Sequence, residues 1–338
     1  MRVSVTGGTG LLGNNVIRQA LQRGWQVVAA VRSETAGPTF QGLEVEFRKS
    51  DLSDPASLSA LAEGVDAIIH CAGFIHIGWT KLDESRRVNV QGTAALAQAA
   101  RERNVPLVHV STVNTLGRKT IEGPADETTK LEDFVACSYV VTKREAEEAV
   151  KAEQQKGLRA TIVYPGFMLG PYDWKPSSGK MMLETLQKKP LVYPTGGCSV
   201  CDARDVADGT LAIVEKGIWN DDFCLAGYNL SYRDLWSRFA ELGGHRKPLW
   251  PIGPAIRRIG SWHYDRLAKK SGDESEINSA AIAMGAQCHC YLSDKAKRAF
   301  GYSNRPLEQT LNETYAWFRE NGYFERYGIR QRAGAGRQ

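Results

Sequence analysis

The sequence predicts an α/β fold in which a parallel sheet lies between two layers of helices. Short runs of β-branched residues alternate with helical stretches through the first half of the chain. These runs are apolar over nearly their whole length, as expected of strands that are buried on both faces. A glycine-rich turn joins the first run to the first helical stretch. The pattern indicates a doubly wound sheet that is followed by a smaller mixed unit.

The elements of the first half follow one another in regular alternation. The first helix, Leu11–Arg23, carries apolar residues that recur with a helical period. We expect strands at Arg2–Thr6, Gln26–Val31, Val45–Asp51, Ala67–Ala72, Leu107–Thr112 and Ala160–Tyr164. We expect further helices at Pro55–Glu63, Glu84–Asn104 and Ser138–Lys156.

The regular alternation ends after Pro165. Five prolines lie between residues 165 and 194, and the later helices are separated by short elements. The helical period and the positions of Pro and Gly predict helices at Met181–Lys188, Asp205–Lys216, Ser231–Leu242 and Pro306–Asn321. The Gly/Ala/Arg-rich tail is expected to be disordered.

Composition excludes several classes of protein. Apolar residues make up 42% and charged residues 24% of 338 residues, the balance of a globular chain. The net charge is +5, and three positive charges lie in the last nine residues. The charge of the remaining chain therefore does not indicate binding to nucleic acid or to a membrane surface. The most apolar stretch, Val65–Trp79, is too short to span a membrane. The chain has seven cysteines, an odd number, and we find no secretory signal in the sequence. We therefore expect a cytoplasmic protein without a disulfide framework.

The turn after the first strand has the features of a phosphate-binding loop. Residues 6–13 read TGGTGLLG and place glycines at 7, 10 and 13. Gly7 would allow the tight turn, Gly10 would let the backbone approach a pyrophosphate, and Gly13 would let the helix pack closely on the strand. The helix amino terminus, including the amides of Leu11 and Leu12, would bind the anion. The loop therefore predicts a dinucleotide cofactor in a Rossmann-type sheet.

Several further motifs resemble those of the extended short-chain dehydrogenase/reductase family. They agree in order and spacing over about residues 1–325. By this resemblance, the cofactor side includes Asp51, Leu52, Cys71, Ala72, Gly73, Tyr164 and Pro165, and Val88–Thr93 matches a helix signature of the family. The segments HVST and LSDKAKRAFGY are similar to the dihydroflavonol-reductase-like branch. The pair Tyr164-Pro165 departs from the Arg-Pro that many relatives carry.

The resemblance divides the chain into units. Residues 1–165 would form the cofactor-binding unit, to which 198–227 is expected to return. Residues 166–325 would mainly bind the substrate, and 329–338 would form the tail. Members of the family commonly dimerise through two long helices, which correspond here to Glu84–Asn104 and Ser138–Lys156.

The end of the second strand indicates which cofactor binds. An NAD enzyme places a carboxylate there for the ribose hydroxyls, whereas an NADP enzyme offers a base to the 2′-phosphate. This strand ends without an acid, and Arg32 follows directly. A guanidinium matches phosphate geometry. We therefore favour NADP(H) over NAD(H), although Glu34 lies nearby.

A tyrosine and a lysine form the candidate catalytic pair. Tyr139 and Lys143 are four residues apart on a predicted helix and so share one face. The lysine ammonium is expected to lower the pKa of the phenol, and the resemblance implies that it also binds the nicotinamide ribose. Tyr139 would then act as the general acid or base for a carbonyl or alcohol. Thr112 aligns with the family's catalytic hydroxyl, and Ser111 is the alternative assignment.

The substrate side is less sharply defined. We expect it to include Ser111, Asn114, Phe167, Met168, Tyr172 and Trp174. Lys175, Lys180 and Arg204 are candidate cations for a substrate pyrophosphate. Cys198, Cys201, Cys288, His289 and Cys290 could in principle hold zinc, but hydride transfer needs no metal, and we predict none.

Three functions remain open at this point. The first is an NADP(H)-dependent carbonyl reductase or alcohol dehydrogenase acting on a small molecule. The second is a nucleotide-sugar epimerase that recycles its cofactor, and the third is a cofactor-sensing protein without activity. Sugar dehydratases of the family carry Asp-Glu after the catalytic Thr, where this chain has Val113-Asn114, so we do not expect dehydration.

Overall fold

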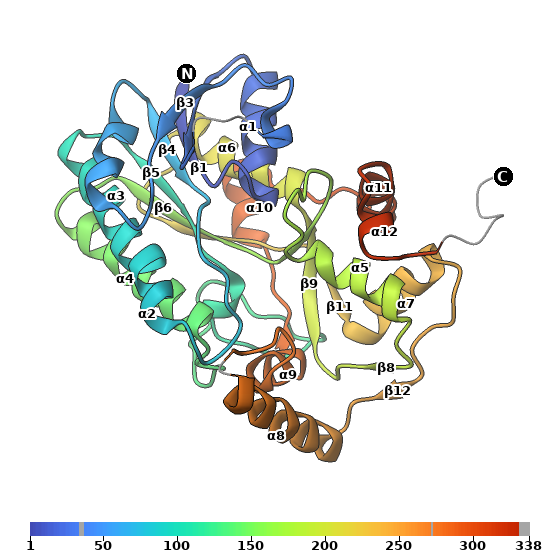
Figure 1. Ribbon diagram of the computed structural model, residues 1–338. Coiled ribbons are helices and arrows are strands. Elements are labelled where there is room, and N and C mark those ends of the chain that lie inside the picture. The colour runs from blue at the N-terminus through green and yellow to red at the C-terminus, as the bar shows by residue number, and fades with distance from the viewer. Residues whose placement is uncertain (34–36, 272, 331–338) are drawn as a thin grey trace.

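The computed structural model describes residues 1–33, 37–271 and 273–330 (Figure 1). A seven-stranded sheet in the order β10-β6-β5-β4-β1-β2-β3 forms its centre, and every pair of strands in it is parallel. The strands are β1 (Arg2–Thr6), β2 (Gln26–Val31), β3 (Glu46–Lys49), β4 (Ala67–His70), β5 (Leu107–Val110), β6 (Ala160–Pro165) and β10 (Asp222–Leu225). The predicted doubly wound parallel sheet is confirmed, and its strand order reverses between β1 and β4.

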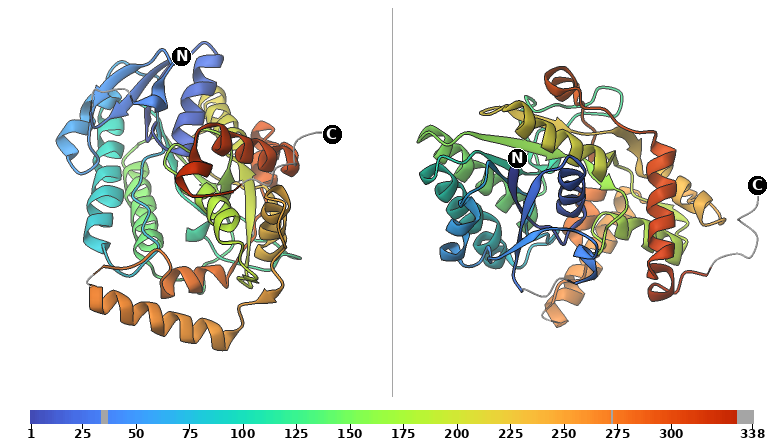
Figure 2. Two further views of the ribbon diagram at one scale, coloured as in Figure 1. Left: turned by 45° about the vertical axis from the view of Figure 1, so that its right-hand side comes forward. Right: turned by 90° about the horizontal axis from the view of Figure 1, so that it is seen from above.

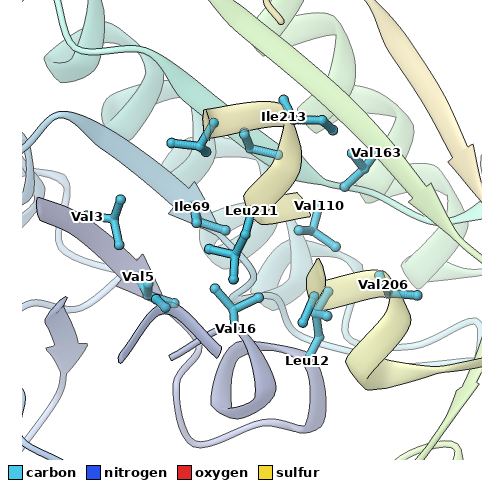
Figure 3. Packing of buried hydrophobic residues seen from close by; sticks show 14 of the residues in the cluster. Val3, Val5, Leu12, Val16, Ile69, Val110, Val163, Val206, Leu211 and Ile213 are labelled. Atoms are coloured by element: carbon cyan, nitrogen blue, oxygen red, sulfur yellow. The ribbon is translucent and has the colours of Figure 1, made fainter. Parts of the chain in front are cut away.

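Helices cover both faces of this sheet. One face packs against α1 (Leu11–Gln22) and α6 (Ala203–Lys216), as Figure 3 shows for Leu12, Val16 and Leu211. The other face packs against α3 (Gly92–Glu102) and α4 (Ser138–Gln155). The apolar residues on both faces of the strands explain why these runs lack the alternation of a half-exposed sheet.

Two predicted helices differ from expectation. The segment after β3 is a 3₁₀ helix, η2 (Pro55–Ala62), instead of an α-helix. The predicted long helix Glu84–Asn104 is interrupted, because α2 (Leu82–Ser85) runs into a π-helical turn, η3 (Arg86–Gln91), before α3 begins. Such wide turns insert an extra residue per turn and occur often at functional sites. Two further 3₁₀ turns are η1 (Pro38–Phe40) and η4 (Val113–Thr115).

A smaller unit with its own sheet and core follows, as predicted. Its sheet has the order β11-β9-β13, and β7 also pairs with β9. The strands are β7 (Phe167–Leu169), β9 (Gly197–Asp202), β11 (Tyr228–Ser231) and β13 (Cys288–His289). The helices of this core are α5 (Gly179–Lys188), α7 (Tyr232–Leu242), α11 (Leu307–Glu320) and α12 (Tyr323–Arg326).

Residues 198–227 contribute to both sheets. Helix α6 packs on α1 and β10 extends the central sheet, whereas β9 belongs to the smaller one. Within the tail assigned to 329–338, Ile329 packs against the core of the smaller unit and Arg330 is exposed, while residues 331–338 lie outside the described part of the chain.

The remaining elements lie mostly along the edge that is lowest in Figure 1. They are β8 (Val192–Tyr193), β12 (Trp250–Pro251), α8 (Pro254–Ser271) and α9 (Ser279–Gly285). Helix α8 was not predicted from the sequence and runs along this edge in Figure 1 and in the left view of Figure 2. Helix α10 (Asp294–Phe300) packs against α6. Among the described residues, no helix is long and apolar enough to cross a membrane.

Candidate active site

The glycine loop lies where β1 ends, next to the end of β4. Gly7 has φ +75°, and a Cβ placed on it would lie 2.7 Å from the backbone nitrogen of Ala72. A Cβ on Gly13 would lie 2.3 Å from the carbonyl oxygen of Gly7. Backbone atoms therefore exclude side chains at both positions, because neither neighbour can move away cheaply.

The third glycine is less constrained by the protein itself. A Cβ on Gly10 would meet only the carbonyl oxygen of Gly7, at 3.4 Å. Helix α1 begins after Gly10 without a side-chain cap and without an acidic residue in its first turn. Its first amides, including those of Leu11 and Leu12, can thus serve an anion, whereas the side chains of both leucines are buried. These features fit the pyrophosphate of a dinucleotide.

An exposed basic residue follows β2, on the side where the adenosine of the cofactor is expected. Arg32 is exposed directly after β2. Asp51 accepts hydrogen bonds from the backbone and hydroxyl of Ser53, both 2.8 Å, which lower the pKa of its carboxyl, as do the weaker effects of Arg32 and Arg87. The sequence analysis did not single out Arg87. Leu52 is half-buried beside α3, and Glu34 lies outside the described residues.

A series of buried hydrogen bonds holds the segment after β4. The backbone nitrogen of Ala72 donates to Thr6 Oγ1 at 3.1 Å, and Thr6 Oγ1 lies 2.7 Å from His70 Nδ1. His70 Nε2 lies 3.0 Å from Thr93 Oγ1. Burial lowers the pKa of His70 to about 3, so its imidazole is neutral. Burial also raises the pKa of the Cys71 thiol to about 12.

Asn89 fixes the next residues of this segment. Its side-chain oxygen accepts from the backbone nitrogen of Phe74 at 2.7 Å, and its Nδ2 donates to the carbonyl oxygen of Phe74 at 2.9 Å. Nδ2 also donates to Thr142 Oγ1 at 3.0 Å. Asn89 therefore joins the π-helical turn, the segment after Gly73 and helix α4. The V-N-V-Q-G-T motif pointed to this region, but we had not assigned it a site residue.

Thr112, Tyr139 and Lys143 converge at the carboxyl end of β5. Lys143 Nζ donates to the carbonyl oxygen of Val110 at 2.6 Å. Thr112 Oγ1 accepts from the backbone nitrogen of Asn114 at 3.3 Å, and the Thr112 hydroxyl interacts with the phenol of Tyr139. Strand β5 and helix α4 thus bring together residues that are far apart in the sequence.

The ionisation of the pair differs from the expectation. Burial raises the pKa of Tyr139 to about 12, although the hydroxyl of Thr112 opposes the shift. Burial lowers the pKa of Lys143 to about 8, against the effects of Glu147 and Cys71. The prediction that Lys143 lowers the pKa of the phenol is wrong for this structure, because desolvation dominates.

Ser111 points to a different partner from Thr112. Its hydroxyl donates to the buried carboxylate of Glu147. Burial raises the pKa of Glu147, against the hydrogen bond from Ser111. Strand alternation sends neighbouring side chains to opposite faces, which favours Thr112 over Ser111 for contact with a substrate. Glu147, one turn after Lys143, was missed by the sequence analysis.

The tyrosine at the end of β6 faces away from the glycine loop. Tyr164 is buried, and its hydroxyl donates to Asp222 Oδ2 at 3.3 Å. Burial raises the pKa of its phenol. Only the backbone of Tyr164 and Pro165 therefore remains suited to contact with a cofactor.

Three of the six residues assigned to the substrate side pack into the smaller unit. Tyr172 stacks on the Arg18 guanidinium at 3.8 Å, and its ring centroid lies 6.2 Å from that of Trp317. The centroids of Trp174 and Trp317 are 5.1 Å apart. Phe167 packs in the same core, and Met168 packs against the core of the central sheet. These contacts are structural, and the substrate roles stay predictions.

Asp173 organises this part of the chain. Its carboxylate accepts from the backbone nitrogens of Ser177 and Gly179, each at 3.2 Å, just before α5. The side chain is buried, and burial raises its pKa to about 7. Buried backbone amides need such an acceptor, which explains an acid among aromatic residues.

The candidate catalytic tyrosine packs beside α9. Tyr139 packs in one apolar cluster with Val140, Ile77, Ala280 and Met284. Its backbone nitrogen donates to the carbonyl oxygen of His76 at 3.1 Å. The surroundings of Tyr139 therefore include an apolar cluster.

The buried carboxylate of Glu274, which precedes α9, binds the segment that follows β4. Glu274 Oε2 lies 3.1 Å from His76 Nε2 and accepts from the Thr80 hydroxyl at 2.8 Å. Its carboxylate also accepts from the backbone nitrogens of Trp79 and Thr80. Hydrogen bonds from Thr80, Trp79 and His76 lower the pKa of Glu274, although burial opposes them. No motif in the sequence predicted this contact.

The cysteines do not gather into a metal centre. Cys198 lies in the core of the smaller unit, whereas Cys201 lies in that of the central sheet. Because both stand on β9 at an odd spacing, their side chains point to opposite faces. Over residues 1–33, 37–271 and 273–330, no group of three His, Cys, Asp or Glu side chains is arranged to hold a metal ion.

Three curated proteins are similar to this chain over most of its length. Sterol demethylase protein B of Methylococcus capsulatus is 30% identical, and the match covers 95% of this chain and 99% of the relative. A Synechocystis protein that carries the provisional name dihydroflavonol 4-reductase is 28% identical over 94% of this chain and 95% of its own length. A ketoreductase of Stigmatella aurantiaca, named for a farnesylated dihydroquinoline oxide, is 28% identical over 91% and 94%.

Two solved structures share the fold. The crystal structure of gox2253 has a TM-score of 0.82 at 30% identity, covering 95% of this chain and 98% of that one. A nucleoside-diphosphate-sugar epimerase from Pseudomonas aeruginosa has a TM-score of 0.77 at 27% identity, covering 96% and 99%. The sequence profile of the NAD dependent epimerase/dehydratase family matches residues 3–226. With this match and the site described above, the chain belongs to the NAD dependent epimerase/dehydratase family.

Proposed function

We propose that this protein is an NADP(H)-dependent oxidoreductase that reduces a ketone or aldehyde, or oxidises the corresponding alcohol. The observation that carries the proposal is the convergence of Thr112, Tyr139 and Lys143 at the carboxyl end of β5. Retention of all three also argues against a cofactor-sensing protein without activity.

The ionisation of the residues suits reduction. The bound cofactor would supply a hydride to the carbonyl carbon. Tyr139, with its pKa raised to about 12, is protonated at neutral pH and donates its proton to the carbonyl oxygen, which yields the alcohol. The Thr112 hydroxyl, which interacts with the phenol of Tyr139, would hydrogen-bond to the same carbonyl oxygen. Lys143 holds helix α4 against β5 through Val110.

The preference for NADP(H) is supported by the end of β2. Arg32 is exposed there, and Arg87 acts on the same carboxylate, Asp51. Two guanidinium groups near the adenosine end suit a 2′-phosphate better than a bare ribose. The carboxylate of Asp51 already accepts two hydrogen bonds from Ser53.

The substrate we propose is a lipophilic carbonyl compound. Ile77, Ala280 and Met284 surround Tyr139 with apolar side chains. Two relatives are named for a sterol and for a farnesylated ring compound. A nucleotide-sugar epimerase would need cations for the substrate pyrophosphate. Of the three candidate cations, Lys180 pairs with Glu276 and Arg204 pairs with Asp202 and Glu313, which leaves the exposed Lys175.

Cofactor consumption tests the proposal. We expect steady oxidation of NADPH, and slower oxidation of NADH, with members of a panel of sterol-like ketones, long-chain ketones, aldehydes and keto-sugars. Tyr139→Phe should lower the rate by about 100-fold or more, whereas Tyr228→Phe on the exposed strand β11 should leave it unchanged. Tight binding of NADPH without net turnover would overturn the reductase and favour the epimerase.

We also propose a cytoplasmic homodimer that pairs through α3 and α4. The seven cysteines are all free, which suits a reducing compartment. Ala97 and Ala100 are buried within the protomer, so the outer faces of both helices would form the interface. Sedimentation at varied concentration tests the dimer, and a persistent monomer would contradict it.

A further inference from the structure

Helix α8 turns its more apolar side to solvent. None of its residues is buried, and Ile256, Ile259, Trp262 and Leu267 are 57%, 67%, 62% and 46% exposed. Ile256, Ile259 and Leu267 are spaced so that they share one face of a helix. A globular helix usually buries such residues in the core, whereas here they are exposed.

The side of α8 that packs on the protein borders this stripe. A Cβ on Gly260 would meet Ile282 Cδ1 of α9 at 3.5 Å. Tyr264 and Ala268 follow Gly260 at helical spacing and are only half exposed. The inner side is thus formed by small and polar residues, and the exposed apolar stripe has no partner among the described residues.

Basic residues share the exposed side of α8 with these apolar side chains. The helix carries five basic residues and one acidic residue, Asp265. Arg258, Arg266, Lys269 and Lys270 are exposed. None of the five basic residues forms an ion pair with any residue that the structure describes. The local charge is therefore strongly positive on a body that is nearly neutral.

Further apolar side chains lie next to α8. Trp250 pairs with Val192 in the short ladder of β12 and β8, four residues before the helix begins. Trp250 and Leu249 are 65% and 56% exposed. Figure 1 shows β8, β12 and α8 along the same edge of the molecule, and Figure 2 shows α8 at the margin from a second side.

We propose that α8, together with β8 and β12, docks on the surface of an anionic lipid bilayer. An exposed helix face that combines apolar side chains, a Trp and basic residues suits the plane of the lipid headgroups. A second copy of this chain is disfavoured as occupant, because a two-fold interface through α8 would bring the unpaired basic residues of both copies together. An anionic bilayer complements both the charge and the apolar stripe.

The same surface lies close to the site. Helix α8 packs on α9, and α9 contributes Ala280 and Met284 to the cluster around Tyr139. A docked protein would therefore hold this side of the site toward the bilayer, where a lipophilic carbonyl compound partitions. This second step rests on the proposed reductase function, whereas docking itself does not.

Vesicle sedimentation tests the docking. The full chain should sediment with vesicles of equal amounts of phosphatidylcholine and phosphatidylglycerol, less with phosphatidylcholine alone, and less as salt rises. Arg266→Glu/Lys270→Glu should lower the partition coefficient by about 10-fold or more, and Ile259→Ser/Trp262→Ser should lower it on anionic vesicles as well. Lys216→Glu/Arg298→Glu, exposed on α6 and α10, changes the net charge equally and should have little effect.

The controls make each result decisive. All these side chains are exposed, so thermal unfolding and NADPH binding should match those of the unmodified chain. If the control pair lost vesicle binding to the same extent, net charge alone would explain the effect and the proposal would be overturned. Self-association that the α8 variants abolish, without vesicle binding, would assign the face to a second copy. If α8 variants lose turnover of a vesicle-borne ketone but keep that of a water-soluble one, the second step is supported; no turnover at all would count against the reductase and leave the docking result standing.

Discussion

Lys143 Nζ donates to the carbonyl oxygen of Val110 at 2.6 Å, which ties the catalytic helix α4 to the last residue of β5. The contact holds an ammonium in a buried position, 5% exposed. A charge in such a place costs free energy and becomes easier to neutralise. We therefore expect the same residue to influence both the pH dependence of activity and the stability.

The pH profile of reduction should report on Lys143. Its pKa is lowered to about 8, so the ammonium loses its proton as pH rises through this value. We expect kcat/KM for NADPH-driven reduction to fall as pH rises past about 8. Lys143→Arg should remove this limb from the activity that remains, because arginine keeps its charge. A limb that persists in the variant would assign the pKa to another group.

The free energy of unfolding should also depend on pH through Lys143. The folded pKa of about 8 lies below the model value of 10.5, so between these values the unfolded chain binds more protons and stability rises with pH. Lys143→Met should lack this rise, which would amount to about 3 kcal/mol at most. Urea unfolding of both proteins at pH 7 and pH 10 measures the difference. Parallel curves for the two would contradict the prediction.

Asn89 should be more important than its position in a turn suggests. Asn89→Ala removes three hydrogen bonds and leaves the buried backbone of Phe74 and the Thr142 hydroxyl without their partner. We expect a loss of about 2–4 kcal/mol in the free energy of unfolding, together with a lower kcat. Gln91→Ala, exposed in the same turn, is the matched control. A stable and active Asn89→Ala protein would show that these contacts are dispensable.

Arg32 should decide between the two nicotinamide cofactors. Arg32→Ala removes an exposed guanidinium after β2, so the fold should be unaffected. The Kd for NADPH should rise by about 10-fold or more, as expected from the loss of a charged hydrogen bond, while that for NADH should stay nearly constant. Fluorescence titration of both cofactors measures this. Equal effects on the two cofactors would place Arg32 outside the phosphate site.

Glu274 should control the mobility of residues 76–80. Glu274→Ala removes the acceptor of two backbone amides, a hydroxyl and the His76 ring. Amide exchange in this segment should become faster, and KM for the carbonyl substrate should rise. Glu276→Ala, which removes only the partner of Lys180, is the control. Unchanged exchange at Trp79 and Thr80 would mean that other contacts hold the segment.

The central sheet and the cofactor loop could be predicted because their signals are local. The apolar runs that became β1, β4 and β5 and the spacing of Gly7, Gly10 and Gly13 each reflect neighbours within a few residues. The spacing of Tyr139 and Lys143 on one helix is equally local. The lengths of helices were predicted less well, because the break before α3 depends on packing between distant segments.

The sequence by itself determined the order of elements, the dinucleotide loop and the residues that meet at the end of β5. Only the tertiary structure decided which environments these residues occupy. It sent Ser111 to Glu147, placed Cys198 and Cys201 in different cores, and lowered the pKa of Lys143. It also turned the apolar stripe of α8 outward. Burial and desolvation depend on which distant segments pack together, and residue types and spacings do not record that packing.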